Sequence, residues 1–197
     1  MLYQASVPID QSALLVIDAQ DSFKLGARWE RRDNRDFERN VGALIDGYRA
    51  AALPVIFFLH TDPDPGFSAD SPAFKLMDFI ERRPEERLFV KRTRNVFTGT
   101  DLGEHLLERG VRRVVITGIQ MEQCCETSTR VAADLGYAVD FVTEATMTFP
   151  IPHPGRPGVE LGVEAIRERT EYVLRGRFAR LRTVAELREE LGTVKVR

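Results

Sequence analysis

The chain has 197 residues, of which 43% are hydrophobic and 29% charged, and its formal net charge is −2. This length and balance are typical of one globular domain spanning residues 1–197, with a single sizeable core. They exclude a basic nucleic-acid-binding arm, and the apolar runs are too short to cross a membrane. We therefore expect a small-molecule partner, with neither nucleic acid nor membrane as a ligand.

The two cysteines, Cys124 and Cys125, are neighbours in the sequence. Adjacent cysteines cannot connect distant parts of a chain, and a disulfide between them would be strained. The first ten residues also lack the basic start and apolar stretch of a signal peptide. Together these features predict a protein of the reducing cytoplasm, where thiols stay free.

Short apolar runs and segments with helical spacing alternate along the chain. The first half is predicted to contain a strand at 12–18, a helix at 36–52, a strand at 55–59, a long loop at 60–84 with one helical turn near 73–80, and a strand at 88–90. The second half is predicted to contain a helix at 100–109, a strand at 111–117, a helix at 122–135, a strand at 138–142, a helix at 158–174 and a strand at 178–181. Thr183 and Glu186 have the spacing of a capping box that opens a final helix. This alternation predicts a three-layer α/β/α fold with a mostly parallel sheet.

Three reactive side chains follow predicted strands. Asp18 ends the first strand, Lys91 follows the third, and Cys124 lies shortly after the fourth. Ligands of such folds bind beyond the carboxyl ends of the strands, so the three could share one site. Taken singly, each has an ordinary explanation: a loop aspartate, a solvated lysine and a packed cysteine.

Cys124 has the strongest local argument for reactivity. If a helix begins near Glu122, Cys124 lies in its first turn, where free N–H groups and the helix dipole favour a thiolate. Cys125 would be turned about 100° around the helix and is expected to serve as a small packing residue.

Three sequence runs, in this order and spacing, resemble the signatures of the isochorismatase-like cysteine hydrolases. They are LLVIDAQDSF (14–23), VKRTRNVFTGTDL (90–102) and VVITGIQMEQCCETSTRVAADLGYAV (114–139). The resemblance implies a six-stranded parallel sheet and a catalytic triad of Asp18, Lys91 and Cys124. It also implies a cis peptide bond between Ile119 and Gln120.

These residues suit an amidohydrolase mechanism. Asp18 would act as general base, and Lys91 would stabilise the Cys124 thiolate. The thiolate would attack the carbonyl of a small carboxamide, carbamoyl or ureido compound and form a thioester. The backbone N–H groups of Gln120 and Cys124 would form the oxyanion hole. Family members that cleave the vinyl ether of isochorismate do not use this cysteine, so Cys124 argues against that reaction.

A metal is not expected. Nicotinamidases of this kind carry an Asp-x-His pair and a further histidine after the second strand. Here the corresponding loop contains His60, Asp62 and Asp64, interrupted by prolines. An ion held by Asp62 and Asp64 is conceivable, but an acidic turn is the simpler interpretation. The predicted enzyme needs no metal and no other cofactor.

The sequence indicates the residues of the substrate pocket less clearly than those of the triad. Phe23 matches a position that faces the substrate in the family, and Trp29, Phe97 and Phe149 are further candidates, although aromatic residues near a sheet are often core. The segment 146–157 is either a lid or a stiff connector, and its His153 is predicted to be neither a triad member nor a ligand. The arginines 28, 31 and 32 either meet a substrate carboxylate or decorate a loop, and the second interpretation is preferred.

Two other function classes stay open. A thiol redox or sensing protein could use the Cys124–Cys125 pair, although no C-x-x-C motif supports it. An inactive relative could serve as an interaction module, against which the complete triad argues. A nicotinamidase-like enzyme with a degenerate metal site is a further alternative. A homo-oligomer, dimer or tetramer, is expected from the family and from the exposed faces of such a small unit.

Overall fold

The computed structural model describes residues 7–195, which form a six-stranded parallel sheet in the order β3-β2-β1-β4-β5-β8. The strands of this sheet are β1 (Ser12–Ile17), β2 (Val55–His60), β3 (Arg87–Lys91), β4 (Arg113–Ile119), β5 (Ala138–Met147) and β8 (Arg180–Leu181). The helices are α1 (Phe37–Ala50), α2 (Leu102–Glu108), α3 (Glu126–Asp134), α4 (Val163–Leu174) and α5 (Val184–Leu191). The predicted three-layer fold and six-stranded parallel sheet are confirmed.

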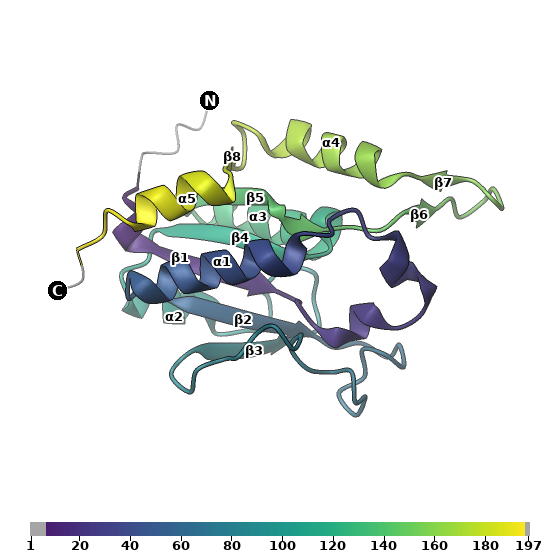
Figure 1. Ribbon diagram of the computed structural model, residues 1–197, viewed down its shortest axis with the longest axis horizontal. Helices are drawn as coiled ribbons and strands as arrows, with labels where there is room; N and C mark the ends of the chain where they lie inside the picture. The colour runs from purple at the N-terminus through teal and green to yellow at the C-terminus, as the bar shows by residue number, and fades with distance from the viewer. Residues whose placement is uncertain (1–6, 196–197) are drawn as a thin grey trace.

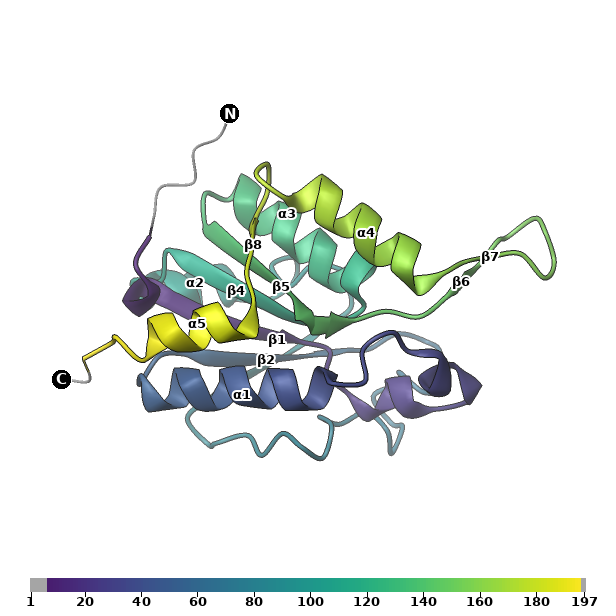
Figure 2. The same ribbon diagram turned by 45° about the horizontal axis from the view of Figure 1, so that its top comes forward.

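Helices cover both faces of the sheet. Figures 1 and 2 show α1 and α5 on one face, and α2, α3 and α4 on the other. The continuous apolar runs of β1, β2 and β4 fit this burial on two sides, since every residue of these strands is buried. Each face therefore closes its own apolar core, and the polar residues at the strand ends remain available for a site.

The final helix begins as the capping box predicts. The Thr183 hydroxyl accepts a hydrogen bond from the Glu186 N–H, and the Glu186 carboxylate accepts one from the Thr183 N–H. These reciprocal bonds satisfy two amide groups that have no partner within the helix.

The segment after β5 differs from the prediction. β5 continues to Met147 instead of ending near residue 142, and a short antiparallel hairpin follows, formed by β6 (Ile151–Pro152) and β7 (Glu160–Leu161). This hairpin extends away from the sheet (Figure 2). The predicted helix at 158–174 consequently starts later, at Val163. The single helical turn expected near 73–80 is absent from the described structure, which has irregular turns there.

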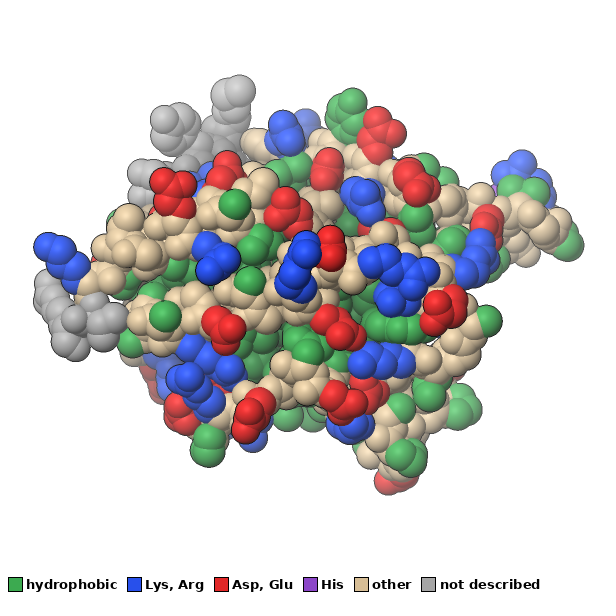
Figure 3. Space-filling model, viewed as in Figure 1, with side chains coloured by type: hydrophobic (Ala, Val, Ile, Leu, Met, Phe, Trp, Pro, Cys, Tyr) green, Lys and Arg blue, Asp and Glu red, His purple; other side chains and the backbone are tan. Residues whose placement is uncertain are grey.

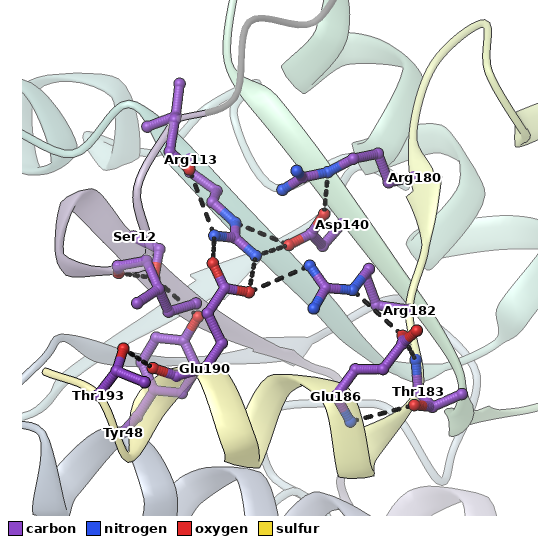
Figure 4. Close-up of polar contacts among 12 residues, drawn as sticks. Ser12, Tyr48, Arg113, Asp140, Arg180, Arg182, Thr183, Glu186, Glu190 and Thr193 are labelled. Carbon is purple, nitrogen blue, oxygen red and sulfur yellow. Dashed lines mark hydrogen bonds and ion pairs between the residues drawn. The ribbon is translucent and has the colours of Figure 1, made fainter.

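A buried ion network lies at the opposite end of the sheet from the three reactive side chains. Arg113 of β4 donates to Asp140 of β5 at 2.7 Å and makes two hydrogen bonds of 2.7 and 3.0 Å to Glu190 of α5 (Figure 4). Arg180 donates to the second oxygen of Asp140, and Arg182 pairs with Glu190. Through these contacts the network links α5 to strands β4 and β5.

On the face that carries α1 and α5, basic and acidic side chains are interspersed (Figure 3). Among residues 7–195, no helix has the length and apolar character needed to cross a bilayer.

Candidate active site

The fold brings Asp18, Lys91 and Cys124 together at the carboxyl end of the sheet. The Lys91 ammonium donates to Asp18 Oδ2 at 2.7 Å and to Cys124 Sγ at 3.4 Å. Asp18 is fully buried, and Lys91 and Cys124 expose only 1% and 4% of their surface. A carboxylate, an ammonium group and a thiol therefore meet in one desolvated cluster.

The backbone around Asp18 is shaped by a close approach of β1 and β4. Asp18 itself has φ +50°, a left-handed conformation that aspartate tolerates better than most residues. Gly118 pairs with Ile17 and has φ +127°, and a Cβ atom there would lie 1.9 Å from the Ile17 carbonyl oxygen. Only glycine permits this contact, which sets the turn after β4 beside Asp18.

Burial and the neighbouring charges together raise the pKa values of Asp18 and Cys124. Burial raises the pKa of Asp18 above 3.8, and Lys91 offsets that rise only in part. Burial, followed by the Asp18 charge, raises the pKa of the Cys124 thiol from 9.0 to about 12, although Lys91 acts to lower it. Desolvation and the neighbouring carboxylate thus oppose the thiolate that Lys91 favours, and this fits the predicted role of Asp18 as the base that takes the thiol proton. Asp18 Oδ1 has no hydrogen-bond partner among residues 7–195, and the neighbouring Cys124 thiol acts to lower the pKa of Asp18.

The turn that carries Cys124 is not the first turn of an α-helix, as predicted, but a π-helical turn that precedes the helix. Met121–Cys125 forms one π-helical turn, and α3 starts only at Glu126, so Cys124 precedes the α-helix instead of lying in its first turn. The N–H groups of Gln123 and Cys125 both donate to the Gln120 carbonyl at 3.2 Å. The peptide bond between Ile119 and Gln120 is cis. π-turns are frequent at functional sites.

Cys125 packs in the apolar core on the same face of the sheet as Cys124. Its side chain is fully buried, and burial raises its thiol pKa well above 9.0. A buried thiol in an apolar setting is chemically inert. The packing role that the sequence predicts for Cys125 fits this position.

Gln20 and His60 border the triad, although the sequence analysis gave neither a role in the site. His60 ends β2, and its Nδ1 lies 3.5 Å from the Lys91 ammonium. Gln20 accepts from the His60 N–H and donates to the His60 carbonyl. Gln20 follows the end of β1, and His60 ends β2. Their contact depends on the pairing of these two strands, which the local sequence does not show.

The residues of the His60 loop do not fit a metal site. His60 Nε2 lies 3.2 Å from Asp62 Oδ2, but it also lies 2.6 Å from a guanidinium nitrogen of Arg94, which takes the place a cation would need. The other Asp62 oxygen accepts from the Asp64 N–H in a local turn. Among residues 7–195, no group of three ligand side chains is arranged to hold a metal ion.

Three of the four candidate pocket aromatics pack together. The Phe23 and Phe149 rings are stacked with centroids 6.0 Å apart, and Trp29 lies 6.5 Å from Phe149. Phe97 instead stacks on Tyr137 and packs against the core on the other face of the sheet. Phe67, which the sequence analysis did not select, contacts Phe23 edge-on at 5.0 Å.

The segment 146–157 combines two different structures. Thr146 and Met147 complete β5, and Phe149 is buried against Phe23, whereas the residues from Ile151 onward form the projecting hairpin. His153 is exposed in that hairpin and accepts from the Gly155 N–H.

The family match decides the classification. Residues 12–174 match the protein family described as Isochorismatase domain. The chain belongs to the isochorismatase family. It is thus a hydrolase of that family, and the predicted resemblance is confirmed.

Relatives and solved structures agree with this membership. Nicotinamidase 3 of Arabidopsis thaliana is 32% identical over 154 residues, which cover 70% of this chain and 74% of that protein. Streptothricin hydrolase of Streptomyces noursei is 32% identical over 142 residues, 71% of this chain and 51% of that protein. A crystal structure of an isochorismatase-family protein from Chromobacterium violaceum has a TM-score of 0.86 at 26% identity, covering 94% of this chain and 95% of that one.

Proposed function

We propose that this isochorismatase-family hydrolase is a cysteine amidohydrolase. It cleaves the C–N bond of a small carboxamide, carbamoyl or ureido compound through a thioester on Cys124. The observation that carries the proposal is the buried contact of Lys91 with both Asp18 and Cys124, at 2.7 and 3.4 Å. The similarity to a nicotinamidase and to a streptothricin hydrolase supports the same class of reaction.

Acylation begins from the protonated thiol. Asp18 takes the proton of Cys124, and its raised pKa makes it a stronger base than an ordinary aspartate. The sulfur attacks the substrate carbonyl carbon, and a C–S bond forms. Asp18 then passes the proton to the amide nitrogen, the C–N bond breaks, and ammonia or an amine leaves. Lys91 stays charged throughout and stabilises the developing thiolate.

The oxyanion of the tetrahedral intermediate is stabilised by the backbone N–H groups of Gln120 and Cys124. The N–H of Gln120 has no acceptor among the residues that the structure describes, and it lies at the start of the nucleophile's turn. A donor already aimed at a desolvated site stabilises developing charge strongly, because it needs no reorganisation.

Deacylation reverses these roles. Asp18 removes a proton from water, and the hydroxide oxygen attacks the thioester carbonyl. The C–S bond breaks, the proton returns to Cys124, and the acid product leaves. One carboxylate therefore serves both half-reactions.

Phe23 and Phe149 form the apolar wall of the pocket, with Trp29 at its edge and Phe97 outside it.

The alternatives receive less support. A thiol redox function needs an accessible cysteine pair, whereas Cys124 and Cys125 are both buried. A nicotinamidase-like enzyme would be a metal-free version, since Arg94 contacts the nitrogen of His60 that faces Asp62.

Ammonia release from a panel of primary amides and ureido compounds, nicotinamide included, tests the proposal. The unmodified protein should release ammonia from at least one compound, and Cys124→Ala should abolish this release. Cys125→Ala is the matched control and should retain most of the activity. Full hydrolysis by Cys124→Ala would contradict the assignment.

A further inference from the structure

Arg28 lies over the aromatic pair that borders the proposed site. It belongs to a short 3-10 helix, η3 (Ala27–Arg31), and its guanidinium carbon lies 4.4 Å from the Phe149 ring centre and 5.0 Å from that of Phe23. The two rings are buried and nearly parallel. Stacking on them fixes the guanidinium plane while its N–H edge stays free to donate.

The neighbouring arginines of this segment are already paired. Arg31 pairs with Glu160, Arg32 donates to the Trp29 carbonyl at 2.7 Å, and Arg35 donates to Glu30. Arg28 differs: among residues 7–195 its guanidinium has no hydrogen bond and no ion pair, only the two rings. Its donors are therefore open to a ligand.

The Phe149 side of this aromatic pair is joined to the nucleophile's turn. Thr148 precedes Phe149, and its hydroxyl donates to the Glu122 carboxylate at 2.6 Å. Glu122 belongs to the same π-helical turn as Cys124. Arg28 is thus linked to the turn that carries the proposed nucleophile through Phe149, Thr148 and Glu122, and the Glu122 charge acts on it.

The Phe23 side is joined to the other edge of the triad. Phe23 contacts Phe67 at 5.0 Å, and Phe67 contacts the His60 ring at 6.2 Å. His60 lies against Lys91. The two rings beneath Arg28 therefore connect to both sides of the cluster.

Glu122 is the acid whose charge acts on Arg28, but it forms no ion pair with it. Its carboxylate accepts from Thr148 and from the side-chain amides of Gln120 and Gln123. Burial against the rings lowers the pKa of Arg28, and Glu122 offsets this only in part. Arg28 is an exposed residue, and a guanidinium that rests on aromatic rings without a carboxylate partner can bind one in a bidentate manner.

We propose that Arg28 binds a carboxylate of the substrate, so that the enzyme acts on amide or ureido compounds that also carry an acid group. This inference rests on the proposed function, because it places the amide end of the same molecule at Cys124. Arg28 then acts as a specificity residue that holds the substrate's distal end. It takes no part in bond cleavage.

Alkylation of Cys124 tests the anion site without any hydrolysis. The rate constants for 4-bromocrotonate and 4-bromocrotonamide are compared, with the modified cysteine located by peptide mapping. The acid or amide group of these reagents lies three bonds from the carbon that the sulfur attacks, so it can reach a distal site. Arg28→Gln should lower the acid-to-amide rate ratio about tenfold, the loss of one charge-assisted contact. Arg35→Gln removes the same charge from the same segment and should change the ratio less than about twofold. An unchanged ratio in Arg28→Gln overturns the inference.

A matched pair of amides separates this inference from the proposed function. The pair is the monoamide of butanedioic acid and butanamide, which share chain length and differ in the carboxylate. Arg28→Gln should lower kcat/KM about tenfold for the acid alone, chiefly through KM. An equal loss on both amides overturns the role of Arg28 and leaves the amidohydrolase standing. Absence of Cys124-dependent hydrolysis, together with an alkylation ratio that depends on Arg28, overturns the proposed function and supports the anion site.

Discussion

The side chain of Gln20 holds the backbone of His60 from both directions. Gln20 Oε1 accepts from the His60 N–H at 2.7 Å, and Gln20 Nε2 donates to the His60 carbonyl at 3.1 Å. Gln20 lies two residues after Asp18, and His60 pairs with Lys91 across β2 and β3. This amide therefore connects the strand ends that position the carboxylate and the ammonium group of the proposed triad.

Removal of this amide should destabilise the fold. Gln20→Ala leaves two buried backbone groups without partners, and we expect the free energy of unfolding to fall by about 1–3 kcal/mol. Urea denaturation measures the change. Gln11→Ala, at the other end of β1 and half-buried, is the control and should cost less than about 0.5 kcal/mol. Equal effects of the two substitutions would contradict the account.

Loss of the Lys91 charge should leave Asp18 as an uncompensated buried carboxylate. Lys91→Met should lower the free energy of unfolding by about 3–5 kcal/mol near neutral pH. Since the folded-state pKa of Asp18 is raised, folding is favoured with Asp18 protonated, and this stability is lost as the pH rises through that pKa. The difference in unfolding free energy between Lys91→Met and the unmodified protein should therefore shrink as the pH falls.

A double substitution checks this explanation. Asp18→Asn combined with Lys91→Met removes both charges and should restore most of the lost stability, because no buried charge remains. Denaturation curves at several pH values give the comparison. A double variant as unstable as Lys91→Met would mean that packing, and not the Asp18 charge, accounts for the loss.

The protonation state of Cys124 gives a spectroscopic prediction. Its thiol pKa is raised to about 12, so the difference in ultraviolet thiolate absorbance between the unmodified protein and Cys124→Ala should stay near zero at neutral pH. It should rise only in strongly alkaline solution. Cys125→Ala should behave like the unmodified protein. A thiolate titrating near pH 7, as in proteins with activated cysteines, would contradict a resting thiol.

The Arg113 network should support stability without affecting chemistry. Arg113→Met leaves Asp140 without its buried cation and should cost about 3–5 kcal/mol of unfolding free energy, measured by urea denaturation. KM should stay unchanged in the folded fraction, since the network lies at the other end of the sheet. Arg39→Ala removes an exposed pair with Asp36 and should cost about 1 kcal/mol at most. Similar costs for the two variants would show that the network contributes little.

The sequence predicts much of this fold because its local patterns agree with the final structure. Continuous apolar runs mark β1 and β2 as doubly covered strands, and the Thr183 capping box marks the start of α5. Asp18, Lys91 and Cys124 could be selected because parallel strands bring their carboxyl ends to one edge. Their mutual distances follow from the sheet order, which periodicity alone does not determine.

Features that depend on tertiary contacts could not be predicted. The raised pKa of Cys124 results from desolvation by the folded chain, an effect that the local sequence does not reveal. The contact between Arg94 and His60 joins residues 34 positions apart, and it decides against a metal at that histidine. Arg28 differs from Arg31 and Arg32 only through the partners that the fold gives to the other two.

The central claim is that Cys124 forms a thioester with the substrate carbonyl. Mixing Cys125→Ala, which leaves a single thiol, with an amide that it hydrolyses and quenching with acid allows the intact mass to be measured. The account predicts a fraction heavier by the substrate minus ammonia, with the adduct on the peptide that contains Cys124. Steady hydrolysis with no adduct on Cys124, and undiminished turnover in Cys124→Ala, would contradict it.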